Sequence, residues 1–233
     1  MAQPERPAAF TTQEFPADVA VALMSREHVL HKVRTALSRS AGQPVEAPPP
    51  VRLTIAESGI EARIETFCAR IEALAGKIYR AQSPEDARNY AAGVLNGRSG
   101  VASNAALLRR CGITTLAGVE SGITDRVRLR ALCSTAACGI TGANYALADT
   151  GTLIMLASAQ EARMISLLPP VHIALVDRER LLTGLDELLT ILPRPAEETS
   201  SMVLITGPSR TADIEQILVR GVHGPGEIHV VLV

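Results

Sequence analysis

The stretch VHIALV, residues 171–176, indicates the fold class of this chain. It is a short and almost entirely apolar run, and EIHVVLV at residues 227–233 has the same character. Such runs are typical of strands that are covered on both faces, as in parallel sheets. Helical patterns alternate with them, notably at residues 182–192 and 212–219. The alternation predicts an α/β fold with a mostly parallel sheet.

Similar patterns predict further strands at residues 77–81, 100–103, 113–117, 131–134, 152–156 and 202–205, and helices at 25–39, 60–76 and from Ser83 onward. A run of three prolines at residues 48–50 breaks regular structure after the first helix. We therefore expect an N-terminal helical extension with a proline-rich linker at residues 1–51, followed by one α/β domain at residues 52–233. Two interpretations of the first helix stay open: it docks a partner, or it packs back onto its own domain.

The overall composition excludes several classes of protein. The 233 residues carry a formal net charge of -1 and include three Phe, three Tyr and no Trp. The chain thus lacks both the positive charge and the aromatic side chains that binding to a nucleic acid requires. The longest apolar runs, such as residues 230–233, are far too short to span a bilayer. Residues 1–15 lack the apolar core of a signal peptide. We therefore predict a cytoplasmic protein with no membrane span.

Four cysteines, at positions 68, 111, 133 and 138, are scattered through the chain. No two of them have the C-x-x-C spacing of a zinc site, a redox dithiol or an iron–sulfur motif. We expect small buried residues, with redox sensing by Cys133 and Cys138 as the alternative. Neither G-x-G-x-x-G nor the P-loop pattern is present. The sequence therefore predicts neither a metal nor a bound cofactor in this chain.

Ligands of open α/β sheets bind in the loops that follow the strands, and three predicted loops contain suitable residues. The first covers residues 139–152, where small residues permit close backbone approach and hydroxyl groups can bind a polar ligand. Its expected binding residues are Thr141, Thr150, Gly151 and Thr152. The alternative is that residues 150–152 only form a turn into a buried strand.

The second loop, residues 206–215, leads from the strand at 202–205 into the helix predicted at 212–219. Backbone N–H groups at a helix start, together with a guanidinium, suit a carboxylate or a phosphate. The expected anion-binding residues are Gly207, Ser209, Arg210 and Thr211, and Asp213 is a candidate catalytic acid or base. The alternative is that Asp213 and Glu215 already neutralise the helix end, and that Arg210 pairs with one of them.

The third loop, residues 221–226, holds His223 between glycines and a proline. A histidine in a rigid turn is a candidate general acid or base. His172, in contrast, is expected to be a core histidine bonded to the backbone.

Three passages resemble the lactate-utilisation protein C family, the LutC/YkgG group with the LUD domain. They are ITGANYALADTGTL at residues 140–153, LLPPVHIALV at 167–176 and ITGPSRTADIEQILVRGVHGPGEIHVVLV at 205–233. The resemblance covers about residues 60–233. It implies a three-layer α/β sandwich like those of ribose-5-phosphate isomerase and the CoA transferases.

The same resemblance implies a role in a system that oxidises L-lactate to pyruvate, with iron–sulfur clusters carried by partner subunits. It does not supply a catalytic assignment, so whether this chain is itself an enzyme stays open. The alternative is an independent enzyme or binding protein for a small anionic substrate, such as a carboxylate, a phosphosugar or a CoA ester.

Overall fold

The computed structural model describes residues 25–44, 58–211 and 219–233, and the chain divides into two compact units, residues 1–52 and 53–233. In the first unit, helix α2 (Arg26–Ala36) begins after Ser25, whose hydroxyl accepts a hydrogen bond from the His28 backbone N–H. None of the helix's residues is buried. Its role as a docking arm stays a prediction.

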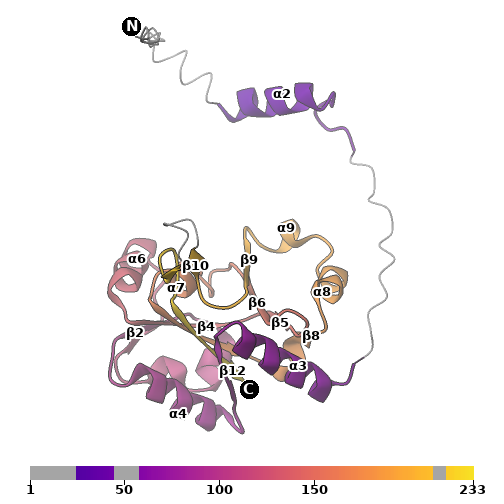
Figure 1. Cartoon of the computed structure of the whole chain (residues 1–233). Coiled ribbons are helices and arrows are strands. Elements are labelled where there is room, and N and C mark those ends of the chain that lie inside the picture. Colours follow the sequence, from indigo (N-terminus) through magenta and orange to yellow (C-terminus); the bar gives the residue numbers. More distant parts are fainter. Residues whose placement is uncertain (1–24, 45–57, 212–218) are drawn as a thin grey trace, which may run out of the picture. The chain divides into compact units, whose positions relative to one another are not determined.

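A six-stranded parallel sheet forms the centre of the second unit (Figure 1). Its strands run in the order β1-β12-β7-β4-β2-β3, and every neighbouring pair is parallel. The strands are β1 (Lys77–Arg80), β2 (Gly100–Ala102), β3 (Val119–Glu120), β4 (Cys138–Gly142), β7 (Val171–Val176) and β12 (Glu227–Leu232). The apolar runs at 171–176 and 227–232 are direct neighbours in this sheet, which confirms the predicted α/β fold with a mostly parallel sheet.

A second, smaller sheet was not predicted. Its four strands, in the order β8-β5-β6-β9, are β8 (Leu181–Leu182), β5 (Tyr145–Leu147), β6 (Thr152–Leu156) and β9 (Met202–Ile205). Strand β6 is antiparallel to both of its neighbours. The strands expected at 152–156 and 202–205 therefore exist, but they pair with each other in this sheet and not in the parallel one.

Helices and the small sheet cover the two faces of the parallel sheet. Along β7, Ala174 and Val176 point to one face and pack with helix α3 (Ile60–Ala73) and with β5 and β6. Ile173 and Leu175 point to the other face and pack with helix α4 (Pro84–Leu95) and helix α5 (Ala106–Arg110). This alternation is the two-residue period of a strand buried on both sides, and it produces three layers.

The remaining elements lie around this core. They are helices α6 (Arg126–Thr135), α7 (Arg163–Leu167), α8 (Leu185–Ile191) and α9 (Pro195–Glu198), the 3₁₀ turns η1 (Ile113–Thr115) and η2 (Arg178–Arg180), and the hairpin strands β10 (Arg210–Thr211) and β11 (Val219–Arg220). Helices α6 and α7 pack together with Val101 of β2. Among the described residues, no helix has both the length and the apolar character that crossing a membrane requires.

Two predicted strands are wrong. Residues 113–117 contain the turn η1, and residues 131–134 lie inside helix α6. The loop expected at 139–144 is largely the central strand β4. Its small residues are there for close packing, because a Cβ added to Gly139 would lie 1.9 Å from the carbonyl oxygen of Ile165 in α7.

The helix predicted at 212–219 falls mostly on residues 212–218, which lie outside the described residues. At residue 219 the prediction is wrong, because Val219 belongs to β11, which pairs with β10. Thr211 is the last residue of β10.

Candidate functional site

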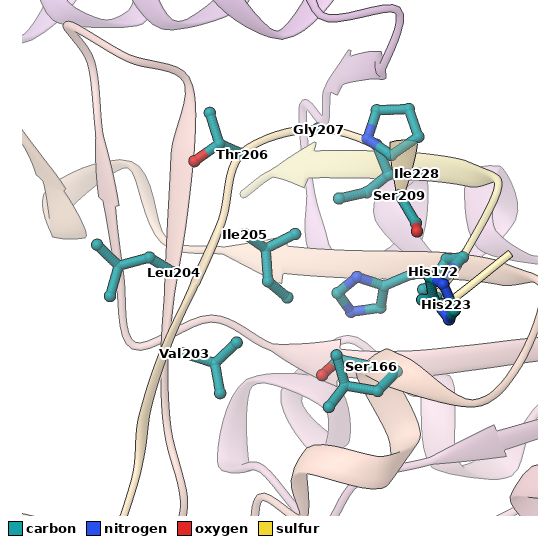
Figure 2. Close-up of a pocket in the computed structure, with 14 residues that line it drawn as sticks. Ser166, His172, Val203, Leu204, Ile205, Thr206, Gly207, Ser209, His223 and Ile228 are labelled. Carbon is teal, nitrogen blue, oxygen red and sulfur yellow. The ribbon is translucent and has the colours of Figure 1, made fainter. Parts of the chain in front are cut away.

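A cavity of about 240 Å³ lies at the amino ends of β7 and β12 (Figure 2). Four segments enclose it: the end of α7, the start of β7, strand β9 with the loop that follows it, and the loop before β12. We call it the histidine pocket, lined by Ser166, Leu167, His172, residues 203–209, His223, Gly224, Pro225 and Ile228. The second and third predicted loops therefore meet here.

His172 is the most deeply buried polar side chain of the pocket, at 1 % exposure. Its Nε2 atom lies 2.7 Å from Oγ1 of Thr141 in the neighbouring strand β4. Its Nδ1 atom is buried and has no hydrogen-bond partner, and Figure 2 shows the ring between Ile205 and Ser166. Burial lowers the pKa of the imidazole to about 4, so the ring is neutral at pH 7. A buried neutral ring with one unpartnered nitrogen can donate a hydrogen bond to a ligand or accept one from it, depending on the tautomer.

Backbone hydrogen bonds fasten the two loops of the pocket to each other. The N–H of Ser209 donates to the carbonyl of Pro225 at 2.8 Å, and the N–H of Gly221 donates to the carbonyl of Ser209 at 3.0 Å. Gly207 turns the chain after β9 with a φ of 82°, a conformation that favours glycine. These constraints hold Ser209 and His223 at the same cavity as His172.

Arg210 does not reach the pocket. Its guanidinium donates a hydrogen bond to the carbonyl oxygen of Leu74, at the end of α3. This contact satisfies a carbonyl that the helix leaves free. Asp213, the predicted acid or base, and Glu215 lie outside the described residues.

The threonines of the first predicted loop are placed in two different environments. Thr141 binds His172, as described above. Thr152 hydrogen-bonds both Thr150, at 2.8 Å, and Thr206, at 2.9 Å, and so links the turn before β6 to the end of β9. Gly151 lies against α3, where an added Cβ would approach Cβ of Arg70 to 2.9 Å. The turn that was left open as the alternative is present.

Among the described residues, the lining of the histidine pocket has polar groups but no lysine or arginine. Its walls are largely the apolar side chains of β9 and Ile228, and its hydrogen-bonding groups are His172, His223 and hydroxyls such as that of Ser209. Such a cavity suits the uncharged part of a small ligand, oriented by a few hydrogen bonds.

His172 is the residue of this pocket whose role sequence reasoning missed. It is buried, as predicted, but its partner is the hydroxyl of Thr141 and not the backbone. Thr141 and His172 are polar residues within otherwise apolar strands, and this pattern could have predicted that they pair with each other. The pairing itself depends on the register of β4 and β7, which places Gly139 opposite His172.

Comparison with known proteins identifies similar sequences and one similar fold. The LUD domain family model matches residues 64–233. A protein named "Lactate utilization protein C" from Halalkalibacterium halodurans is 38% identical over 106 residues, which cover 44% of this chain and 46% of that protein. One of the same name from Exiguobacterium sp. is 40% identical over 108 residues, covering 45% and 47%. The match thus spans just under half the length of each relative.

A solved structure of a DUF162 family protein from Deinococcus radiodurans has the same fold. It superposes with a TM-score of 0.58, covering 76% of this chain and 99% of that one at 21% sequence identity.

Proposed function

The chain belongs to the LUD domain family, and we propose that it is a subunit of a system that uses L-lactate by oxidising it to pyruvate. The observation that carries this proposal is the match of residues 64–233 to the family, together with the names of its relatives. The electrons from lactate would pass to iron–sulfur clusters on partner subunits.

The cysteines of this chain support the assignment of clusters to a partner. All four are buried, and burial raises the pKa of Cys111 and Cys138 and raises that of Cys133 to about 11. An iron–sulfur cluster is bound by thiolates, most often four of them. Buried thiols distributed over three separate core clusters do not fit that requirement.

Deleting the gene in its native cells tests the proposal. We expect the cells to lose growth on L-lactate, to keep growth on pyruvate and to recover when the wild-type gene is restored. The tagged protein should also co-purify with a partner that contains iron and acid-labile sulfide. Normal growth on lactate together with an iron-free preparation would refute the proposal.

A second candidate function is binding of a small anionic compound, such as a carboxylate, a phosphosugar or a CoA ester. The unpartnered Nδ1 atom of His172 favours ligand binding, since the uncharged part of such a compound in the histidine pocket would supply the missing hydrogen bond. Thermal-shift measurements with lactate, pyruvate, sugar phosphates and CoA check this function. Stabilisation of the wild type that is lost in Ser209→Ala or His172→Gln supports it, and equal shifts in all three proteins contradict it.

A further inference from the structure

A second cavity, of about 390 Å³, lies at the carboxyl ends of β2, β4 and β7. This is the opposite edge of the parallel sheet from the histidine pocket, and it is the edge where open α/β sheets bind their ligands. We call it the carboxyl-edge pocket. Its chemistry comes from Gly142, Tyr145, Glu161, Asp177 and Arg180.

Glu161 is a carboxyl group buried in this pocket, at 6% exposure. One oxygen, Oε2, accepts hydrogen bonds from Oγ of Ser103 at 2.7 Å and from the backbone N–H of Gly142 at 3.2 Å. The other oxygen, Oε1, is buried and has no partner. Buried polar atoms are rarely left unpaired, so Oε1 is a vacant hydrogen-bonding position at the ligand-binding edge of the sheet.

Burial determines the protonation state of this group. It raises the pKa of Glu161 to about 8, against the lowering effect of the two hydrogen bonds. The carboxyl is therefore mostly protonated at neutral pH. Because Oε2 already accepts two hydrogen bonds, the proton belongs on Oε1, where it can be donated to a ligand oxygen.

The other charges of the carboxyl-edge pocket leave one cation available. Asp177 is paired with Arg110 of α5. Arg180 donates to the hydroxyl of Tyr145 at 3.3 Å and lies 5.3 Å from the centre of that ring. Within the described part of the chain, no acidic side chain forms an ion pair with Arg180. An exposed guanidinium without an ion-pair partner can bind a carboxylate through two hydrogen bonds.

We propose that the carboxyl-edge pocket binds a small carboxylic acid that carries a second oxygen, with its carboxylate on Arg180 and its hydroxyl or carbonyl oxygen on Oε1 of Glu161. A single cation beside Asp177 suits a monoanion better than the dianion of a phosphate. The choice of lactate and pyruvate as ligands rests on the proposed role in lactate utilisation, but direct binding to the purified chain tests the site separately from that role.

Isothermal titration of the purified chain with pyruvate, L-lactate, propionate and inorganic phosphate tests the proposal. We expect pyruvate or lactate to bind more tightly than propionate, which has no second oxygen, and more tightly than phosphate. The Kd of the wild type should rise about tenfold between pH 6.5 and pH 9, since a group with a pKa of about 8 is only about one-tenth protonated at pH 9. The other charged or titratable groups at this pocket are Tyr145, Asp177 and Arg180, which line it, and Arg110, which pairs with Asp177.

The variant Glu161→Gln distinguishes the contribution of Glu161 to the pH dependence from the contributions of these neighbours. Its amide is a neutral donor at every pH, so the variant should bind at pH 6.5 and lose the tenfold weakening at pH 9. Glu179→Gln is the matched control, because it makes the same Glu-to-Gln substitution at an exposed position beside Arg180, and its Kd should keep the tenfold pH dependence of the wild type. Arg180→Gln, also at an exposed position, should weaken binding at both pH values.

Four results would overturn the proposal. They are no binding of pyruvate or lactate at millimolar concentration, equal affinity for propionate or phosphate, a wild-type Kd that does not change with pH, and the same pH dependence in Glu161→Gln. If Glu161→Gln does not fold, the decision falls to Arg180→Gln, and undiminished binding there refutes the proposal. Loss of lactate growth in the deletion strain is a separate result and leaves this outcome unaffected.

Discussion

Acidification should destabilise the domain through His172. In the folded chain, burial lowers the imidazole pKa from 6.5 to about 4. The unfolded chain therefore takes up a proton between those two values, whereas the folded chain does not. Stability depends on the difference in bound protons, so this contribution is complete above pH 6.5 and is lost as the pH falls toward 4.

The size of the effect follows from the two pKa values. Between pH 7 and pH 5 the folded imidazole stays mostly neutral while the unfolded one becomes protonated, and the linkage relation predicts a loss of about 2 kcal/mol. The full cost, reached below pH 4, is about 3 kcal/mol. A domain with a typical unfolding free energy of about 5–15 kcal/mol would show this loss clearly.

Urea unfolding at pH 7 and pH 5 measures the loss in the wild type and in His172→Gln. Other groups, including Glu161 and His229, titrate in both proteins, so the difference between the two isolates His172. The variant should lose about 2 kcal/mol less than the wild type on acidification. His31→Gln, at an exposed position of α2, is the matched control and should follow the wild type. Equal losses in wild type and His172→Gln would refute the reasoning.

Three further predictions concern packing and burial. Gly139→Ala should lower the unfolding free energy by several kcal/mol or prevent folding, because its Cβ would lie 1.9 Å from the Ile165 carbonyl oxygen. Gly93→Ala, which has open space around it in α4, should instead raise the unfolding free energy by up to about 1 kcal/mol. Equal urea midpoints for the two variants would contradict this. Glu161→Gln should exceed the wild type in stability by up to about 4 kcal/mol at pH 8, and the gain should vanish below about pH 3.5, where the carboxyl is protonated in both the folded and the unfolded state. Native Cys133, whose pKa burial raises to about 11, should react with a thiol reagent only after unfolding, and fast native labelling would contradict its burial.

Parts of the candidate site could be predicted because they depend on local sequence. Glycine and proline mark the turns at 206–209 and 221–226, so the loops that carry Ser209 and His223 were identifiable. The structure shows that both loops line one cavity. The direction of Arg210 was not predictable, because its partner, the Leu74 carbonyl, lies 136 residues earlier in the chain.

Glu161 shows most clearly which properties of the site the sequence could not predict. In the sequence it is an ordinary glutamate in the segment AQEAR, residues 159–163. Its raised pKa comes from burial under elements that contribute Ser103 and Gly142, which are 58 and 19 residues away. Desolvation depends on the surroundings in three dimensions, so no local pattern reports it.

The sequence by itself determined the α/β class, since short apolar runs such as 171–176, alternating with helical patterns, are typical of a sheet that is covered on both faces. It also determined the capped start of α2 and the turns of the pocket loops, which depend on nearby residues. Only the tertiary structure decided that the glycine-rich segment at 139–142 is a central strand, that β5, β6, β8 and β9 form a second sheet, and that Glu161 lies at the ligand-binding edge. These features depend on strand register and on close packing between segments that are distant in the sequence. The packing interactions that stabilise them form only when those segments come into contact.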